Sequence, residues 1–205
     1  MANNCYNVIS FFGNDKVIEQ VATWRKQIES FKPSKEDPYC MKAIREVFYP
    51  NVPINNIDMG SKWVHLDDES TGAYEDQLGL QSAWRSPDLL LEHMTCLLFK
   101  LDPNVVVENL FNIEDGSIGF RYMTPNDEYS AYIQEGNYMI NYEEYDDPQD
   151  AESEVYELYK DQKLEYISDL IVEMPGRFDL FKKFMPDLVD DWDSFKQELD
   201  ERLED

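Results

Sequence analysis

Few side chains in this sequence are suited to chemistry: two histidines and three cysteines stand among 205 residues, at His65, His93, Cys5, Cys40 and Cys96. His93 and Cys96 are three residues apart, but a zinc site needs more ligands than these and no further Cys/His cluster accompanies them. His65 lies close before Asp67 and Asp68, so a general base is conceivable there. A half-exposed strand residue is the commoner role for a histidine in such a segment. We therefore expect ordinary structural roles for both histidines.

Acidic residues could supply a metal site or a catalytic pair. Residues 67–69 and 146–150 gather carboxylates, but neither run follows the D-x-[DN]-x-[DN]-G spacing of a calcium loop. Carboxylate pairs also catalyse glycoside hydrolysis, yet 43 acidic residues provide pairs under any fold. The sequence contains no G-x-S-x-G, G-x-x-x-x-G-K-[ST] or G-x-G-x-x-G motif. It thus predicts no catalytic residue, no cofactor and no metal site, with a small metal-assisted hydrolase as the alternative.

Charge is the conspicuous property of the chain. The 43 Asp and Glu outnumber the 18 Lys and Arg, which gives a formal net charge of −25 and a pI near 4.2. Such a chain repels phosphate backbones and anionic lipid, so we expect neither direct nucleic-acid binding nor membrane binding. No apolar run approaches the ~20 residues of a membrane span. The first residues lack a secretory signal pattern and the cysteine count is odd, so we expect a cytoplasmic protein with reduced thiols.

Local periodicity predicts an α+β domain over residues 1–142. Strands are expected at 5–12, 62–66, 78–84, 105–111, 118–123, 129–134 and 138–142, the last four as two successive hairpins. Helices are expected from an Asn14 or Asp15 cap to residue 31, over 39–49, and from a Ser86 cap to residue 99. With 42% hydrophobic and 14% aromatic residues the chain can build a core, where we expect the Trp and Tyr rings to lie.

Beyond residue 142 the sequence changes to an acidic helical segment, 143–205. It holds 22 acidic and seven basic residues, a net charge of −15 in less than a third of the chain. We expect a long helix ended by Pro175-Gly176, a short helix from Phe178, and a last helix that begins at Pro186. We expect this segment to pack on the first domain through its apolar residues.

The order strand, helix, strand, strand, helix, strand is that of a ferredoxin-like split βαβ core. The opening Met1-Ala2-Asn3-Asn4-Cys5-Tyr6-Asn7 and the segment Ala83-Trp84-Arg85-Ser86-Pro87-Asp88-Leu89-Leu90 resemble the YubB ferredoxin-like family of small phage and plasmid proteins. The acidic, glycine-containing stretch 114–119 stands where that family carries a hairpin, and the family usually has Trp where this chain has Asn4. The resemblance covers about residues 1–125 and implies a fold, without catalytic residues.

The overall character of the chain is also similar to counter-defence proteins of lytic phages of the anti-DarT-factor type. Proteins of that type block a DNA-modifying ADP-ribosyltransferase toxin, so this likeness implies an inhibitor that acts by binding a host factor.

Closely spaced carboxylates in the acidic segment indicate a use for the negative field, because like charges four residues apart on a helix cost a few tenths of a kcal/mol per pair. We predict that the segment occupies a basic, nucleic-acid-binding surface of a host factor, such as a DNA-modifying toxin or a nuclease. A solubilising acidic surface and a virion or assembly accessory protein are alternatives. The predicted partner-binding residues are Glu143, Glu144, Asp146, Asp147, Asp150, Glu154, Glu157, Asp161, Glu165, Asp190, Asp191 and Asp193.

Overall fold

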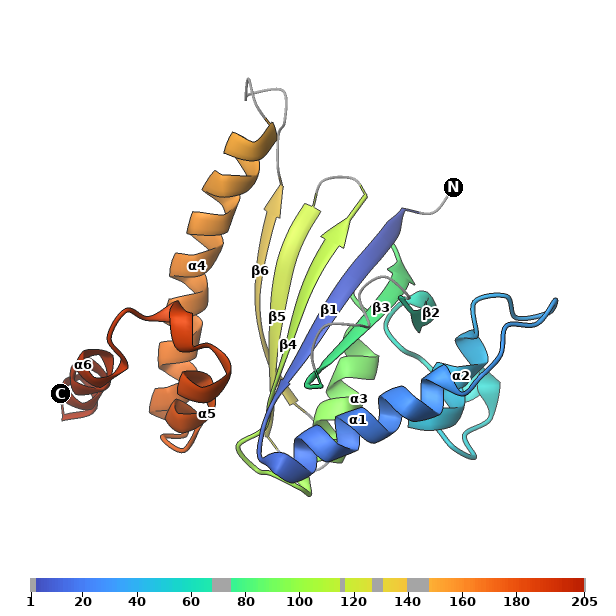
Figure 1. The fold of residues 1–205 in the computed structure, drawn as a ribbon, viewed down its shortest axis with the longest axis horizontal. Helices are drawn as coiled ribbons and strands as arrows, with labels where there is room; N and C mark the ends of the chain where they lie inside the picture. Colours follow the sequence, from blue (N-terminus) through green and yellow to red (C-terminus); the bar gives the residue numbers. More distant parts are fainter. Residues whose placement is uncertain (1–2, 68–74, 115–116, 127–130, 140–147, 205) are drawn as a thin grey trace. The chain divides into compact units, whose positions relative to one another are not determined.

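An antiparallel sheet of six strands organises the first part of the chain in the computed structural model (Figure 1). The structure describes residues 3–67, 75–114, 117–126, 131–139 and 148–204. It divides into two units, Met1–Met139 and Ile140–Asp205. The division falls three residues before the boundary expected from composition. That the second unit packs on the first stays a prediction.

The strands of the first unit pair in the order β2-β3-β1-β4-β5-β6. Every pair of neighbours is antiparallel. The bounds are Asn4–Phe12 for β1, Lys62–Leu66 for β2, Gln77–Ala83 for β3, Val106–Ile113 for β4, Ser117–Pro125 for β5 and Ala131–Met139 for β6. The mixed α and β class is confirmed.

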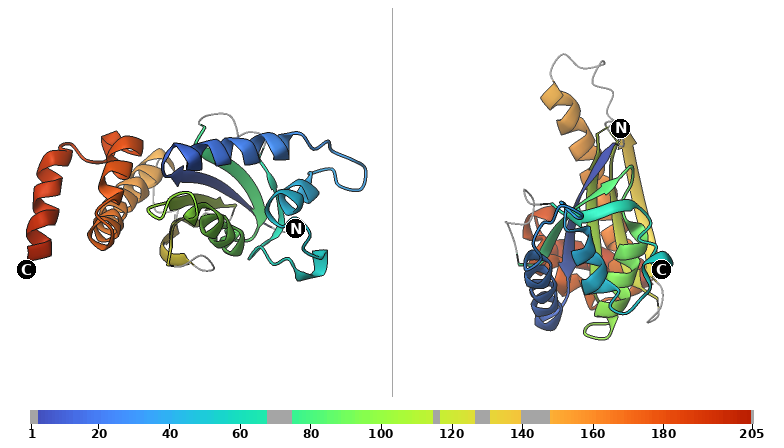
Figure 2. Two further views of the ribbon diagram at one scale, coloured as in Figure 1. Left: turned by 90° about the horizontal axis from the view of Figure 1, so that it is seen from below. Right: turned by 90° about the vertical axis from the view of Figure 1, so that its right-hand side faces the viewer.

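Helices α1 (Asp15–Glu29), α2 (Met41–Phe48) and α3 (Asp88–Phe99) share one hydrophobic core with the sheet. In Figure 2 α1 lies alongside β1 and β3. The expected Asn14 cap is confirmed, since its side-chain oxygen accepts from the backbone N–H of Lys16 at 3.0 Å. The expected apolar face of α1 is buried, and its Trp24 ring lies 5.0 Å from that of Phe48. Helix α3 is largely buried, as its composition predicts.

The second expected hairpin, at 129–142, is wrong. Strand β6 continues through Glu135-Gly136-Asn137 and pairs with β5 along its whole length, from Pro125↔Ala131 to Ser117↔Met139. A turn at residues 135–137 would leave half of β5 without this partner, and unpaired backbone groups in a sheet are costly. Gly136 lies opposite Phe120 in the register. Residues 140–142 lie outside the described residues.

The expected Ser86 cap of α3 is also wrong. Pro87 occupies the N-cap position and makes no side-chain cap bond. Ser86 is buried and its hydroxyl accepts from Asn109 Nδ2 at 2.8 Å. Asn109 Nδ2 also lies 3.0 Å from Asn7 Oδ1. The hydroxyl therefore serves a buried polar network between distant segments rather than the helix start.

The second unit contains three helices within the described residues: α4 (Pro148–Glu173), α5 (Arg177–Phe184) and α6 (Trp192–Glu204). Its buried rings include Trp192, whose centroid lies 5.6 Å from that of Phe178 and 5.7 Å from that of Phe195. Pro175-Gly176 separates α4 from α5 as expected. Pro186 starts only a short 3-10 turn, Pro186–Leu188, so the predicted start of the last helix is wrong by six residues.

Across the described ranges, none of the helices has both the length and the apolar character that crossing a membrane requires.

Candidate functional site

The twelve predicted partner-binding residues divide into three groups in the structure. Four of them, Glu143, Glu144, Asp146 and Asp147, lie outside the described residues. Three more, Asp150, Glu154 and Glu157, belong to helix α4. The remaining five have described side chains and all five are exposed: Asp161 and Glu165 on α4, and Asp190, Asp191 and Asp193 around the start of α6.

Exposure is shared by every acidic residue of the second unit whose burial is described. These are Asp161, Glu165, Asp169, Glu173, Asp179, Asp187, Asp190, Asp191, Asp193, Glu198, Asp200 and Glu201. Apolar side chains fill the interior while the carboxylates face solvent, which is the arrangement that leaves a negative field outside the unit.

Ion pairs within the unit engage some of these carboxylates. Among the described residues, Asp193 pairs with Lys182 at 2.8 Å, Glu173 with Arg177 at 2.8 Å, Asp200 with Lys196 at 2.7 Å and Asp169 with Arg202 at 3.6 Å. The pairs of Asp193, Asp200 and Asp169 are exposed on both sides and are worth only about 0–1 kcal/mol, so a partner's cation can replace the internal one, whereas Arg177 of the Glu173 pair is buried. Asp193, a predicted binding residue, is thus engaged in a weak internal pair and remains exposed.

Asp191 has a structural role at the start of α6. Its Oδ1 accepts from the backbone N–H of Asp193 at 3.0 Å and of Ser194 at 3.3 Å, and its Oδ2 accepts from the Ser194 hydroxyl at 2.7 Å. These hydrogen bonds, led by those from Ser194, lower the pKa of the carboxyl. Capping of α6 is therefore a sufficient role for Asp191, and no binding partner is needed to explain its position.

The candidate chemical groups are engaged in the fold. His93 Nε2 lies 2.8 Å from the Phe48 carbonyl oxygen, and its ring stacks on Tyr49 with centroids 4.5 Å apart. His65 Nδ1 lies 2.7 Å from the Trp63 carbonyl oxygen. Within the part of the chain that the structure describes, no three His, Cys, Asp or Glu side chains gather as a metal site would require. That the chain has no catalytic residue stays a prediction.

Two of the four tryptophans contradict the expectation that the aromatic residues lie in the core. Trp24 and Trp192 are buried, but Trp63 is 54% exposed and Trp84 is 47% exposed. The two exposed rings lie 5.4 Å apart, and Lys62 Nζ lies 5.7 Å from the centroid of the Trp84 ring. This exposed pair of indoles makes the surface around Trp63 and Trp84 a candidate for binding.

Both exposed tryptophans have a left-handed backbone, with φ of 55° at Trp63 and 67° at Trp84. Bulky residues rarely adopt this conformation, which costs about 1–2 kcal/mol each. The irregular register of β2 between Lys62 and His65 contains Trp63. The adjoining backbone is held by Ser61 Oγ, which donates to the Ala83 carbonyl at 2.7 Å, and by Arg85 Nε, which donates to that of Gly60 at 2.5 Å.

A signal for one of these residues was present in the sequence. Val64 and Leu66 alternate with Trp63 and His65, so an inward Val64 implies an outward Trp63. No such signal exists for Trp84, which continues the inward series of Leu78, Leu80 and Ser82 until its left-handed backbone ends that series.

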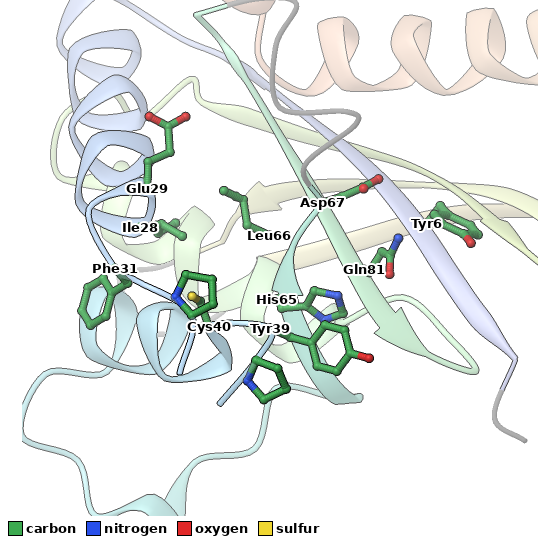
Figure 3. Close-up of a pocket in the computed structure, with 12 residues that line it drawn as sticks. Tyr6, Ile28, Glu29, Phe31, Tyr39, Cys40, His65, Leu66, Asp67 and Gln81 are labelled. Carbon is green, nitrogen blue, oxygen red and sulfur yellow. The ribbon is translucent and has the colours of Figure 1, made fainter. Parts of the chain in front are cut away.

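Two neighbouring cavities of about 630 Å³ and 560 Å³ lie beside this surface and share Pro38, Tyr39, His65 and Gln81. We call them together the aromatic groove. Figure 3 shows the larger cavity between the end of α1, which carries Glu29, and strands β2 and β3, where Asp67 directly follows β2 and Gln81 belongs to β3. The smaller cavity extends to Trp63 and Met41. The groove joins polar groups to exposed rings, and no spacing in the sequence indicates it.

Comparisons with family models, curated proteins and solved structures gave no match to the chain.

Proposed function

We propose that this chain is a non-catalytic interaction protein that inhibits a nucleic-acid-acting host factor by covering its basic surface, with phage counter-defence as the concrete setting. The observation that carries the proposal is that every described acidic residue of the second unit is exposed. A surface that binds a cationic site must keep its charges in solvent until the partner arrives, and opposite fields also speed the encounter.

The spacing of the charges supports an occupant of a nucleic-acid site. Asp161, Glu165, Asp169 and Glu173 follow one another at steps of four residues along α4, which is about 6 Å of helix axis per carboxylate. Duplex DNA presents one charge per about 1.7 Å, so one helical row falls short and further carboxylates around the start of α6 are needed.

The fold of the first unit is proposed to be a ferredoxin-like split βαβ core of the YubB type. The order β2-β3-β1-β4, with α1 and α3 in one core, supports this proposal, and β5 with β6 extends the sheet beyond it. This part would then serve as the scaffold of the inhibitor.

Charge reversal in the second unit tests the function. The variant Asp161→Lys, Glu165→Lys, Asp190→Lys changes three exposed carboxylates that take part in no ion pair shown above. The matched control Glu19→Lys, Glu36→Lys, Glu75→Lys makes the same change in net charge in the first unit, also at exposed positions. Immobilised proteins are incubated with host lysate at low and high salt, and bound partners are eluted with duplex DNA.

We expect a basic partner that duplex DNA displaces and whose retention falls by about threefold to a hundredfold in the second-unit variant, because three exposed contacts of about 0.2–1 kcal/mol each are lost. The control variant should retain the partner. Equal capture by the two variants, or a partner that DNA does not release, would contradict the proposal.

A further inference from the structure

Charged groups of one sign line the aromatic groove. Glu29 and Asp67 are its charged residues apart from the titratable His65, and neither Lys nor Arg is found among the described residues that line it. Asp67 is only 8% exposed. A cleft lined by charges of one sign concentrates the potential of those charges, and here the sign is negative. The charge pattern of the groove therefore fits a cationic group.

Four aromatic rings among the described residues also line the groove. Tyr6, Phe31 and Tyr39 line the larger cavity, and Trp63 joins Tyr39 in the smaller one. The rings of Tyr39 and Trp63 are 62% and 54% exposed, so a ligand can reach them. The face of such a ring carries negative potential and attracts ammonium or guanidinium groups.

Hydrogen-bond acceptors complete the arrangement. The Trp63 carbonyl oxygen 2.7 Å from His65 Nδ1 can only accept, so Nδ1 carries the hydrogen and Nε2 of the neutral ring is an acceptor. The Gln81 amide also lines both cavities and provides a carbonyl oxygen. Guanidinium matches this set better than ammonium, since it is planar, stacks on rings and offers five donors in a fixed plane.

We infer that the aromatic groove binds an arginine side chain presented by a basic protein segment. This site lies in the first unit and is independent of the carboxylates of the second, so it goes beyond the proposed function. Phosphate-bearing ligands are disfavoured because the net charge of −25 repels them. The larger cavity, about 630 Å³, leaves room for residues that flank the arginine.

Binding of capped tripeptides to the full chain tests the inference. The probes are acetyl-Gly-Arg-Gly-amide and its isosteric neutral analogue with citrulline in place of arginine, followed by NMR shifts of the Tyr39, His65 and Gln81 amides. We expect saturable shifts with the arginine probe at millimolar concentration, as for a single anchored side chain. The citrulline probe should bind at least tenfold more weakly.

Two groove variants and one matched control locate the site. Glu29→Gln and Tyr39→Ala should each weaken the arginine probe at least threefold. Glu19→Gln removes the same charge from the same helix, at an exposed position outside the groove, and should leave its affinity unchanged. Both groove residues are exposed, so these variants keep the fold, which their amide spectra verify.

Three results would overturn the inference. Equal affinity for the citrulline probe would mean that the groove takes a neutral or proline-rich segment. An effect of Glu19→Gln as large as that of Glu29→Gln would mean non-specific attraction. Saturable binding of uridine monophosphate without binding of the arginine probe would assign the groove to a nucleotide.

Discussion

The stabilities of the variants Trp84→Gly and Trp84→Ala test whether residue 84 has the left-handed backbone that turns its ring away from the core. At φ of 67° a residue with a Cβ is strained, so Trp84→Gly should be more stable than Trp84→Ala by about 1 kcal/mol. The same two substitutions at Trp24, in the interior of α1, should give the opposite order, because alanine is about 1 kcal/mol better than glycine inside a helix.

The absolute losses should also differ between the two sites. Trp24 is 6% exposed, so Trp24→Ala removes a core side chain at a cost of about 3–5 kcal/mol. Trp84 is 47% exposed, so Trp84→Ala forfeits about 100 Å² of buried surface, or about 2.5 kcal/mol as an upper value.

The assay is urea unfolding followed by circular dichroism, which does not depend on the tryptophans that are removed, with free energies from linear extrapolation. An alanine variant at residue 84 that is more stable than the glycine variant would refute the left-handed assignment. A loss at residue 84 as large as that at residue 24 would place Trp84 in the core, as the alternation in the sequence predicts.

Two further predictions concern titratable groups. Burial raises the pKa of the Cys5 thiol from 9.0 to about 11 and that of the Tyr49 hydroxyl from 10.0 to about 12, so the folded chain holds both protons more tightly than the unfolded chain. The free energy of unfolding should therefore be constant just below pH 9.0 and fall as the pH rises from 9.0 through 11, by about 3 kcal/mol for Cys5. The substitution Cys5→Ala should flatten this fall in urea titrations at successive pH values. Asp191→Ala should lower the thermal stability of the second unit while Asp191→Asn, which keeps a capping oxygen, should lower it less. The advantage of the native chain over both variants should shrink in melting curves as the pH falls below 3.8 and the native carboxylate is protonated, because its pKa in the folded chain is lowered. Equal melting temperatures for both variants and the native chain would show that the cap is unimportant.

The predicted carboxylates show how far composition can locate a site. Exposure of Asp161 and Glu165 follows from their place in polar positions of a helix, and the structure agrees. Asp190 is exposed as well, but it lies between the 3-10 turn and α6 rather than in the predicted last helix. The sequence did not predict that Asp191 and Asp193 make contacts within the unit. The hydrogen bonds of Asp191 depend on where α6 begins, and the ion pair of Asp193 with Lys182 joins two different helices. Pro186 was a plausible start for α6, but a proline with a fixed φ suits the first turn of a 3-10 helix equally well.

The aromatic groove could not be predicted from the sequence for a different reason. Its walls come from β1, the end of α1, the segment around Tyr39, and strands β2 and β3. No lining residue of any one of these segments forms a recognisable motif in the sequence. Only the pairing of β3 between β1 and β2 brings Tyr6, Gln81 and His65 to one surface.

By itself the sequence determined the local properties of this protein: the strand and helix periods, the Asn14 cap, the apolar face of α1 and the concentration of charge after residue 142. These depend on neighbours within a few residues, where spacing and side-chain type decide the free energy. The tertiary structure alone decided the continuous β6, the buried partner of Ser86, and the outward Trp84. Each of these is set by contacts or backbone geometry between segments that are distant in sequence, and such contacts overrule a local preference worth only about 1 kcal/mol.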